Sequence, residues 1–249
     1  MKPRVFFGTM YSGEAEYEMC KNAIHIQREL KNLHHEVIEG LPEKEAHNEL
    51  WTSWEKEKSH FDLFVKIDAD TILCDDHAIS RVWELFNENK RVTGAQLRLH
   101  DFFTDDLISG LNFFTPIVRF NTSPDLYCDR VDWNHDVVLK GESVKHLEPI
   151  GWHAKFPSDK QSFHYGYHRA LKGQTTTLKN LTYVWLKTND RSRMFAVLGV
   201  MAAMKNRTRG ADHSYGNDTF EASFSLVAKE DFESLYELCF RFVQMTGLT

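Results

Sequence analysis

The stretch that decides the fold reads Phe61-Asp62-Leu63-Phe64-Val65-Lys66-Ile67-Asp68-Ala69-Asp70. Its apolar residues favour a buried strand, and two aspartates stand at the carboxyl end of that strand. Because side chains alternate between the two faces of a strand, Lys66, Asp68 and Asp70 point the same way if the chain stays extended. Two carboxylates placed so closely repel each other, and a bound divalent cation relieves the repulsion.

The Asp68-Ala69-Asp70 triplet is informative through its context. A triplet of this kind is expected by chance about once in a chain of this composition, so the motif alone is weak. Here it follows an apolar strand and precedes the apolar pair Ile72-Leu73. The competing interpretation is an acidic turn that caps the next helix, to which Asp75 and Asp76 would contribute.

Outward from this strand, the first 90 residues alternate between the strand and helix periods. Such alternation is typical of an α/β fold, with a mixed, mostly parallel sheet flanked by helices. We expect strands at 5–9, 36–40 and 61–67, and helices at 15–33, 42–58 and 79–86.

The rest of the chain changes character from strands to helices. Strands are expected at 91–99, 115–120, 127–139 and 143–150, and helices at 163–172, 191–204 and 231–245. No linker-like tract separates these regions, which predicts one catalytic domain over 1–249. Within it, 1–90 would bind the donor, 91–172 would complete the metal and acceptor sites, and 173–249 would form a helical C-terminal portion.

Composition excludes several classes of protein. The 249 residues carry a formal net charge of -6, which disfavours a dedicated nucleic-acid binder. The longest apolar run, Met194 to Met204, is too short for a membrane span of about 20 residues. The N-terminus lacks the apolar region of a signal peptide, and the four cysteines form no Cys-x-x-Cys pair. A cytoplasmic protein with reduced thiols is the expectation.

The order of elements, together with the segment ending in Asp68-Ala69-Asp70, resembles the nucleotide-sugar-binding half of a GT-A fold glycosyltransferase, with similarity to family 2-like enzymes. The resemblance implies a sugar or glycan acceptor and a nucleoside-diphosphate sugar donor, most simply a UDP-sugar. It also implies that Mn²⁺ or Mg²⁺ bridges the diphosphate to Asp68 and Asp70. By position, Thr9, Tyr11 and Glu39 would face the nucleoside, with Lys66 beside them. The family usually has an aspartate followed by small polar residues where this chain has Glu39-Gly40-Leu41-Pro42.

A second informative stretch runs from Gly151 to Lys172. Ser158 is a suitable N-cap for the helix that follows. On that helix His164 and His168 are four residues apart and share one face, which Lys172 continues. The resemblance implies that a histidine in this stretch completes the metal site. His153 is favoured and His168 is the alternative, with His168, Arg169 and Lys172 close to the departing diphosphate.

The acceptor side is less defined by the sequence. An inverting enzyme needs a carboxylate base, for which the candidates are Asp101, Asp105, Asp106, Asp129, Asp132 and Asp136. Asp132 and Asp136 are favoured because they precede the His153 segment. Aromatic residues of the middle region form either an acceptor platform or core, namely Phe102, Phe103, Phe113, Phe114 and Trp133. His34, His35 and His47 are expected at the surface, and the loop 210–217 is a candidate lid.

Two other functions stay open at this point. A nucleotidyltransferase acting on a sugar phosphate can also place a nucleotide over such a sheet. Its usual basic phosphate loop would correspond to Gly8-Thr9-Met10-Tyr11-Ser12-Gly13, which contains no Lys or Arg. A non-catalytic sugar- or nucleotide-binding protein would use the same fold without turnover.

Overall fold

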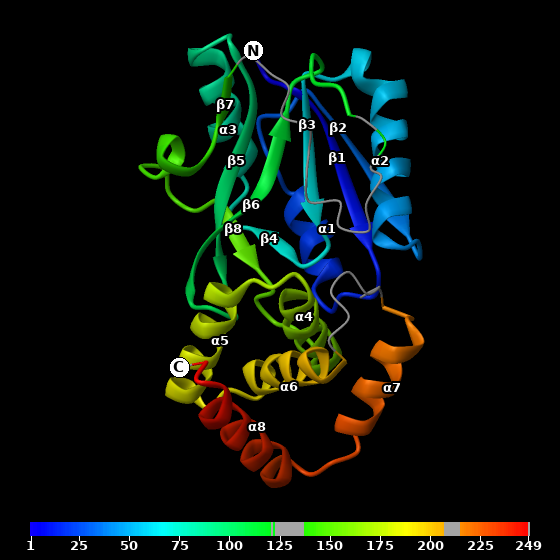
Figure 1. Ribbon diagram of the computed structural model, residues 1–249. Helices are drawn as coiled ribbons and strands as arrows, with labels where there is room; N and C mark the ends of the chain where they lie inside the picture. The colour runs from blue at the N-terminus through cyan, green and yellow to red at the C-terminus, as the bar shows by residue number, and fades with distance from the viewer. Residues whose placement is uncertain (121, 123–136, 207–214, 249) are drawn as a thin grey trace. The chain divides into compact units, whose positions relative to one another are not determined.

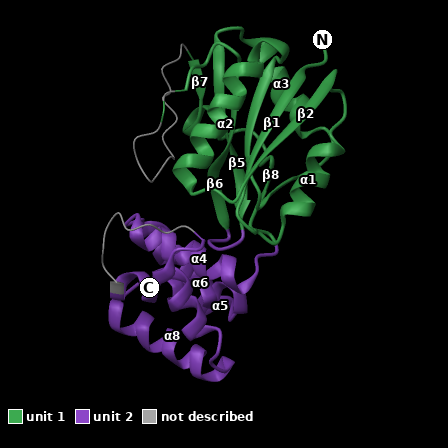
Figure 2. Cartoon of the chain, turned by 90° about the vertical axis from the view of Figure 1, so that its right-hand side faces the viewer, with its two compact units in different colours: residues 1–101, 106–155 green, residues 102–105, 156–249 purple. Residues whose placement is uncertain are grey.

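The computed structural model of the protein describes residues 1–120, 122, 137–206 and 215–248. The chain forms two compact units (Figure 2), of which the first comprises residues 1–101 and 106–155. The second comprises residues 102–105 and 156–249. The helical portion therefore begins near residue 156, earlier than the expected boundary at 173. The assignment of 1–249 to one catalytic domain stays a prediction.

The first unit is built on one mixed sheet (Figure 1). Its strands are β1 (Arg4–Tyr11), β2 (Asn32–Glu39), β3 (Leu63–Asp68), β4 (Thr71–Leu73), β5 (Val92–Asp101), β6 (Asp106–Phe114), β7 (Val137–Leu139) and β8 (Gly151–His153). Their order is β2-β1-β3-β6-β5-β8-β4, and β7 pairs with β5 off this path. Within the described residues, four of the seven strand pairings are parallel. The expected mixed, mostly parallel sheet is confirmed.

Alternating side chains of β1 serve the two faces of the sheet. Val5 and Phe7 belong to the core formed with α1 (Tyr17–His25) and α3 (Ala78–Glu88). Phe6 points the other way, into the core formed with α2 (Glu43–Glu57). The helices thus cover both faces, as expected for an α/β fold. The sheet, its helical cover and the helical second unit agree with a GT-A-like fold.

Several expected elements differ from those observed. The helix expected over 15–33 ends at His25, because Glu29 takes a left-handed φ of 61° and β2 pairs with β1 from Asn32 onward. The strand expected at 115–120 is absent, since the hairpin partner of β5 is residues 106–114. In the stretch 143–150, the short helix η2 (Gly141–Val144) leads into turns rather than a strand. A second short helix, η1 (Lys58–His60), follows α2.

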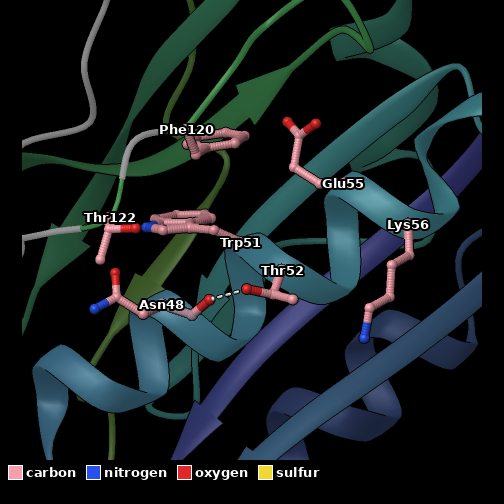
Figure 3. A pocket seen from close by; sticks show the side chains of 7 residues that line it. All are labelled: Asn48, Trp51, Thr52, Glu55, Lys56, Phe120 and Thr122. Atoms are coloured by element: carbon pink, nitrogen blue, oxygen red, sulfur yellow. Dashed lines mark hydrogen bonds between the residues drawn. The ribbon is translucent and has the colours of Figure 1, made fainter.

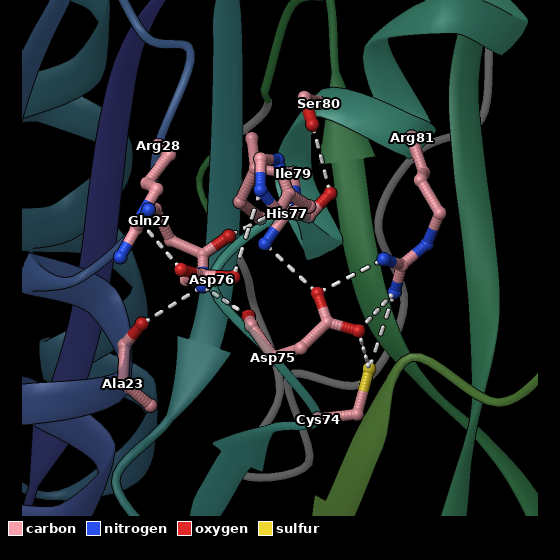
Figure 4. A network of polar contacts seen from close by, with 10 residues as sticks. All are labelled: Ala23, Gln27, Arg28, Cys74, Asp75, Asp76, His77, Ile79, Ser80 and Arg81. Atoms are coloured by element: carbon pink, nitrogen blue, oxygen red, sulfur yellow. Dashed lines mark hydrogen bonds and ion pairs between the residues drawn. The ribbon is translucent and has the colours of Figure 1, made fainter.

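Asp75 and Asp76 belong to the network that starts α3 (Figure 4). The Asp75 carboxylate accepts the His77 amide at 2.8 Å and the Arg81 guanidinium at 2.9 Å. That guanidinium lowers the pKa of Asp75 to about 2. The buried Gln27 side chain ties the end of α1 to the same turn, since it donates to the Asp75 carbonyl and accepts from the Ile79 amide. Asp75 and Asp76 therefore form the acidic turn before this helix, whose N-cap residue is His77, and the Asp68-Ala69-Asp70 triplet lies earlier, before β4.

The second unit consists of five helices in its described part. They are α4 (Asp159–Leu171), α5 (Thr175–Thr188), α6 (Arg191–Asn206), α7 (Asp218–Val227) and α8 (Phe232–Thr246). The helices expected at 163–172, 191–204 and 231–245 are confirmed, whereas α5 and α7 were not foreseen. Among the described residues, no helix has the length and apolar character that crossing a membrane requires.

Glycines bring α4 and α6 into close contact. A Cβ atom at Gly166 would lie 1.8 Å from the Ala196 carbonyl oxygen, and one at Gly199 would lie 2.0 Å from that of Phe163. Only glycine permits so close an approach of two backbones. The residues around Gly199 are almost completely buried, so the apolar run 194–204 forms the core of this unit.

Candidate metal centre

Two aspartates mark the carboxyl end of β3. Asp68 is the last residue of the strand, and Asp70 lies in the turn to β4. The Lys66 ammonium donates to Asp68 Oδ1 at 2.7 Å, so these two side chains share a face as the alternation predicts. The Asp68 side chain is 46% exposed, whereas that of Asp70 is 18% exposed. Both carboxylates stand where α/β sheets bind ligands.

Backbone pairing brings His153 to the same place. In the β4–β8 ladder Thr71 lies opposite His153, and the Ala154 amide donates to the Asp70 carbonyl at 2.9 Å. The imidazole Nε2 of His153 then lies 3.4 Å from Asp70 Oδ2. This ladder brings together Asp70 and His153, two of the metal ligands that the sequence predicts.

A third acid, Asp101, contacts the other ring nitrogen of His153. Asp101, the last residue of β5, lies opposite His153 in the parallel β5–β8 pairing. Its Oδ1 is 2.6 Å from His153 Nδ1, and its side chain has no exposed surface. The sequence gives Asp101 as one of six candidate bases. Its partner comes from a strand 52 residues away, a pairing that short-range patterns do not reveal.

The donor chemistry of this group fits a hard divalent cation. Among the described residues, no group of three or more His, Cys, Asp or Glu side chains is arranged so as to hold a metal by itself. Mg²⁺ and similar ions are commonly held by one or two carboxylates together with substrate phosphates, not by a complete protein cage. The facing oxygen of Asp70 and nitrogen of His153, with Asp68 alongside, suit that incomplete kind of site.

Nearby carboxyl groups show how strongly negative this end of the sheet is. The pKa of Glu14 is raised to about 7, mainly by burial and in part by the charges of Asp70 and Asp68, although the hydrogen bond from the Ser12 amide lowers it. Burial and the same two aspartates also raise the pKa of the Cys20 thiol. Burial likewise opposes ionisation of Asp68, but Lys66 outweighs this effect and holds its pKa below the usual value. A cation would therefore be attracted here.

His47 was expected at the surface, and that expectation is wrong. It lies on α2 with only 2% of its surface exposed, and its ring stacks on Trp51. Burial and, to a smaller extent, the positive charge of Lys66 lower its pKa to about 4. His47 is therefore a neutral core residue beside the Lys66–Asp68 pair. His34 is exposed as expected, whereas His35 is partly buried.

The residues expected to face a nucleoside lie at the ends of β1 and β2. Tyr11 is opposite Glu39 in the ladder, and its ring stacks on Tyr17 with centroids 4.2 Å apart. Thr9 is fully buried, and its hydroxyl lies 2.9 Å from His35 Nε2. Tyr11 and Glu39 are therefore placed at the strand ends as expected, whereas Thr9 lies inside the packing of the sheet.

The remaining basic candidates belong to α4 in the second unit. Ser158 caps this helix by accepting the Gln161 amide at 3.2 Å, as predicted. His164 and His168 share a face, with ring centroids 5.7 Å apart. Arg169 lies over the Tyr165 ring and donates to Gln174, and Lys172 is the C-cap residue. Roles for His168, Arg169 and Lys172 in donor binding stay predictions.

Several acceptor-side candidates have a different position or lie outside the described residues. Asp132, Asp136, Asp129 and Trp133 lie outside them, as do positions 210–214 of the candidate lid. Phe103, Phe113 and Phe114 are at most 1% exposed, so they are core and not an open acceptor platform. In the second unit, the Phe103 ring stacks on Tyr165 and the Phe102 ring is covered by Arg193.

A shallow cavity of about 320 Å³ lies over α2 (Figure 3). Its aromatic wall is Trp51 stacked on Phe120, with ring centroids 4.2 Å apart and planes 5° apart. Around them lie polar residues, namely Asn48, Thr52, Glu55, Lys56 and Thr122. None of the residues that the sequence predicts for a site lines this cavity.

Comparison with solved structures finds similar folds at low identity. The mannosyltransferase PcManGT from Pyrobaculum calidifontis, solved with GDP-Man and Mn²⁺, is 11% identical over 98% of this chain and 81% of its own, with a TM-score of 0.44. A glycosyltransferase involved in glycosylation of the major capsid of PBCV-1 is 11% identical over 45% of this chain, with a TM-score of 0.33. A197 from STIV is 9% identical over 45% of this chain, with a TM-score of 0.35.

The protein spans 60% of the PBCV-1 chain and 64% of the A197 chain. No family model matches the sequence, and a search of curated proteins finds no match. At these identities and TM-scores the likenesses carry no argument about what this protein does. Its function is therefore argued from the residues themselves.

Proposed function

We propose that the protein is a glycosyltransferase that transfers a sugar from a nucleoside-diphosphate donor with the help of Mn²⁺ or Mg²⁺. One observation carries the proposal. At the carboxyl end of β3, Asp70 Oδ2 and His153 Nε2 face each other at 3.4 Å beside Asp68. Two hard oxygen donors and an imidazole at this end of an α/β sheet suit a cation that is shared with a diphosphate.

The chemistry requires positive charge at the leaving group. When bound, the cation would offset the negative charge that develops on the departing diphosphate. Asp68, Asp70 and His153 are the residues that would hold it. Lys66 pairs with the Asp68 carboxylate, since its ammonium lies 2.7 Å from Oδ1, and a bound cation would compete with it for that carboxylate. Tyr11 and Glu39, at the ends of adjoining strands, suit contacts to the nucleoside.

The finer assignments belong to the same proposal. We expect a uridine diphosphate donor and a sugar or glycan acceptor, with Asp132 or Asp136 as base if the reaction inverts the anomeric centre. Arg169 and Lys172 would assist the diphosphate. Replacing Arg169 or Lys172 by Met would then weaken diphosphate binding without changing the affinity for the cation alone.

Calorimetry with a panel of nucleoside diphosphates tests the proposal. The protein is titrated with UDP and with GDP, each with and without Mn²⁺. Binding of at least one diphosphate that requires Mn²⁺, and that is lost in Asp70→Asn, is the expected result. Asp75→Asn is the matched control, because Asp75 is a nearby acid that pairs with His77 and Arg81 and lies outside the proposed site.

Turnover separates the proposal from its alternatives. Even without an acceptor, a glycosyltransferase slowly hydrolyses its donor: water takes the acceptor's place, and free sugar and nucleoside diphosphate are released. A nucleotidyltransferase would instead release pyrophosphate from a nucleoside triphosphate and a sugar phosphate. Failure of every diphosphate to bind, or equal binding by Asp70→Asn, would show that the site is wrongly assigned.

A further inference from the structure

The further inference concerns Asp101, a buried acid beneath the proposed cation site. Its carboxylate has no exposed surface, and its Oδ1 lies 2.6 Å from Nδ1 of His153. A buried carboxylate is costly unless it accepts strong hydrogen bonds. Because the carboxylate accepts, Nδ1 of the imidazole carries the hydrogen in this bond. The other ring nitrogen, Nε2, lies on the side of the ring toward Asp70.

The second ring nitrogen of His153 faces a second carboxylate. His153 Nε2 lies 3.4 Å from Asp70 Oδ2. A lone pair on nitrogen and a negative oxygen at this separation are favourable together only when they share a positive partner, which is either a proton on Nε2 or a bound cation. Histidines that bind metals commonly donate their second ring N–H to a carboxylate, which sets the tautomer and the ring orientation. The Asp101–His153–Asp70 series has the geometry of such an arrangement.

The sheet itself holds this series in place. Asp101 and His153 end a run of three paired residues in which Leu99 lies opposite Gly151 and His100 opposite Trp152. On its other edge, β8 pairs with β4 directly after the turn that contains Asp70. Asp101 and His153 therefore stand on neighbouring strands, and Asp70 lies in the turn that leads into the next strand, β4. Ladder hydrogen bonds set the spacing of Asp101 and His153, and the bond from the Ala154 amide to the Asp70 carbonyl fixes the turn that carries Asp70.

A role as the acceptor's base does not fit Asp101. A base must reach the hydroxyl proton of a bound acceptor within hydrogen-bond distance. The Asp101 side chain is fully buried, and its Oδ1 is bound to His153 Nδ1. Asp106 lies opposite Asp101 in the β5–β6 ladder. It is exposed and has no such contact with the histidine.

We propose that Asp101 is a positioning residue that keeps the hydrogen of His153 on Nδ1 and presents Nε2 to a divalent cation shared with Asp70. The inference rests on the proposed function, because it takes the cation from there. It adds a residue that touches neither the cation nor the donor. Such residues commonly change metal affinity by about tenfold to a hundredfold when replaced.

The first test uses the unaltered protein labelled with ¹⁵N-histidine. Nuclear magnetic resonance at saturating Mg²⁺ identifies which ring nitrogen of His153 bears the hydrogen. We expect a protonated Nδ1 and an Nε2 without hydrogen. A hydrogen on Nε2, with or without one on Nδ1, would overturn the inference. This measurement needs no variant, so it holds even if Asp101 proves essential for folding.

The second test compares Mn²⁺ binding by electron paramagnetic resonance in three proteins, with UDP absent and present. Asp101→Asn should weaken Mn²⁺ binding by about tenfold to a hundredfold, whereas the matched Asp106→Asn should bind like the parent. In turnover assays, the Mn²⁺ concentration for half-maximal rate should rise in Asp101→Asn, with kcat at saturating Mn²⁺ within about threefold of the parent.

The outcomes separate the two claims. If the parent binds no Mn²⁺ under either condition, the proposed function loses its cation site. If the parent binds Mn²⁺ and Asp101→Asn binds it equally well, the proposed function survives and only the role of Asp101 is refuted. If Asp106→Asn loses as much affinity as Asp101→Asn, a general effect of charge accounts for the change, and the positioning role is likewise refuted.

Discussion

Replacement of Gly199 by alanine should destabilise the second unit through a backbone collision. The added Cβ would lie 2.0 Å from the carbonyl oxygen of Phe163 and 2.9 Å from the amide nitrogen of Tyr167. The first distance falls about 1.4 Å short of the 3.4 Å at which ordinary contact begins. Both obstacles are backbone atoms of α4, so no side-chain rotation removes them.

The magnitude follows from two opposing effects. Alanine is the better helix former, which favours Gly199→Ala in the interior of α6 by about 1 kcal/mol. Overpacking of a rigid core typically costs about 1–3 kcal/mol, and the upper end applies because the two helices must separate by more than an ångström. Separation also weakens the dispersion contacts of buried residues such as Phe163 and Phe195. We expect a net loss of about 2 kcal/mol or more.

Urea denaturation followed by circular dichroism measures this loss. The parent, Gly199→Ala and a control variant, Lys179→Ala, are compared under the same conditions. Lys179 is exposed on α5, so its replacement should change the free energy of unfolding by less than about 0.5 kcal/mol. Unchanged or increased stability in Gly199→Ala would refute the reasoning, because the helix preference alone would then decide the outcome.

Three further predictions concern charge and capping. The pKa of Glu14 is about 7 in the folded protein against an ordinary value of 4.5, so the native state binds the proton more tightly than the unfolded state. The stability of the parent therefore falls as the pH rises from 4.5 to 7. Glu14→Gln should be more stable than the parent by about 1–3 kcal/mol at pH 8 and equal to it at pH 4, as urea midpoints would show. A variant whose advantage is the same at both pH values would contradict this assignment. Lys66→Met removes the positive charge 2.7 Å from Asp68 Oδ1 and should strengthen Mn²⁺ binding about threefold to tenfold in a paramagnetic resonance titration; weaker binding would show that Lys66 organises the site and does not compete for it. Ser158→Ala removes the cap of α4 and should cost about 1 kcal/mol in urea denaturation, whereas a cost near zero would mean that Ser158 does not stabilise the helix.

Local patterns account for much of the fold. The apolar run before Asp68 predicts β3, and the alternation of strand and helix periods predicts a sheet covered on both faces. The spacing of Ile79, Val82 and Phe86 likewise predicts α3, and all three are buried there. These elements are decided by the period of their own apolar residues, so the sequence is sufficient to find them.

The missed features depend on partners distant in the chain. Apolar spacing continues past Ile26, but Gln27 turns away to bond Asp75 and Ile79, about 50 residues further on. Asp101 was recognisable as an acid at the end of a strand, yet its pairing with His153 requires knowledge of which strands are neighbours. His47 is different, because it precedes Leu50 and Trp51 by a helical turn. That spacing indicated its burial on the apolar face of α2.

The site likewise combines residues that the sequence predicts with contacts that depend on partners distant in the chain. The sequence alone was enough to propose Asp68, Asp70 and His153, through strand ends and resemblance. Only the ladder between β4 and β8 brings Asp70 and His153 to 3.4 Å. The supporting acid and the raised pKa of Glu14 arise from the packing around them.

The most direct measurement of the central claim is a crystal of the protein soaked with Mn²⁺ and a nucleoside diphosphate, with anomalous diffraction recorded at the manganese edge. The account predicts one strong anomalous peak within coordination distance of Asp70 and His153, with diphosphate density beside it. A nucleoside diphosphate bound elsewhere in the protein, or a manganese peak away from both residues, would contradict the claim.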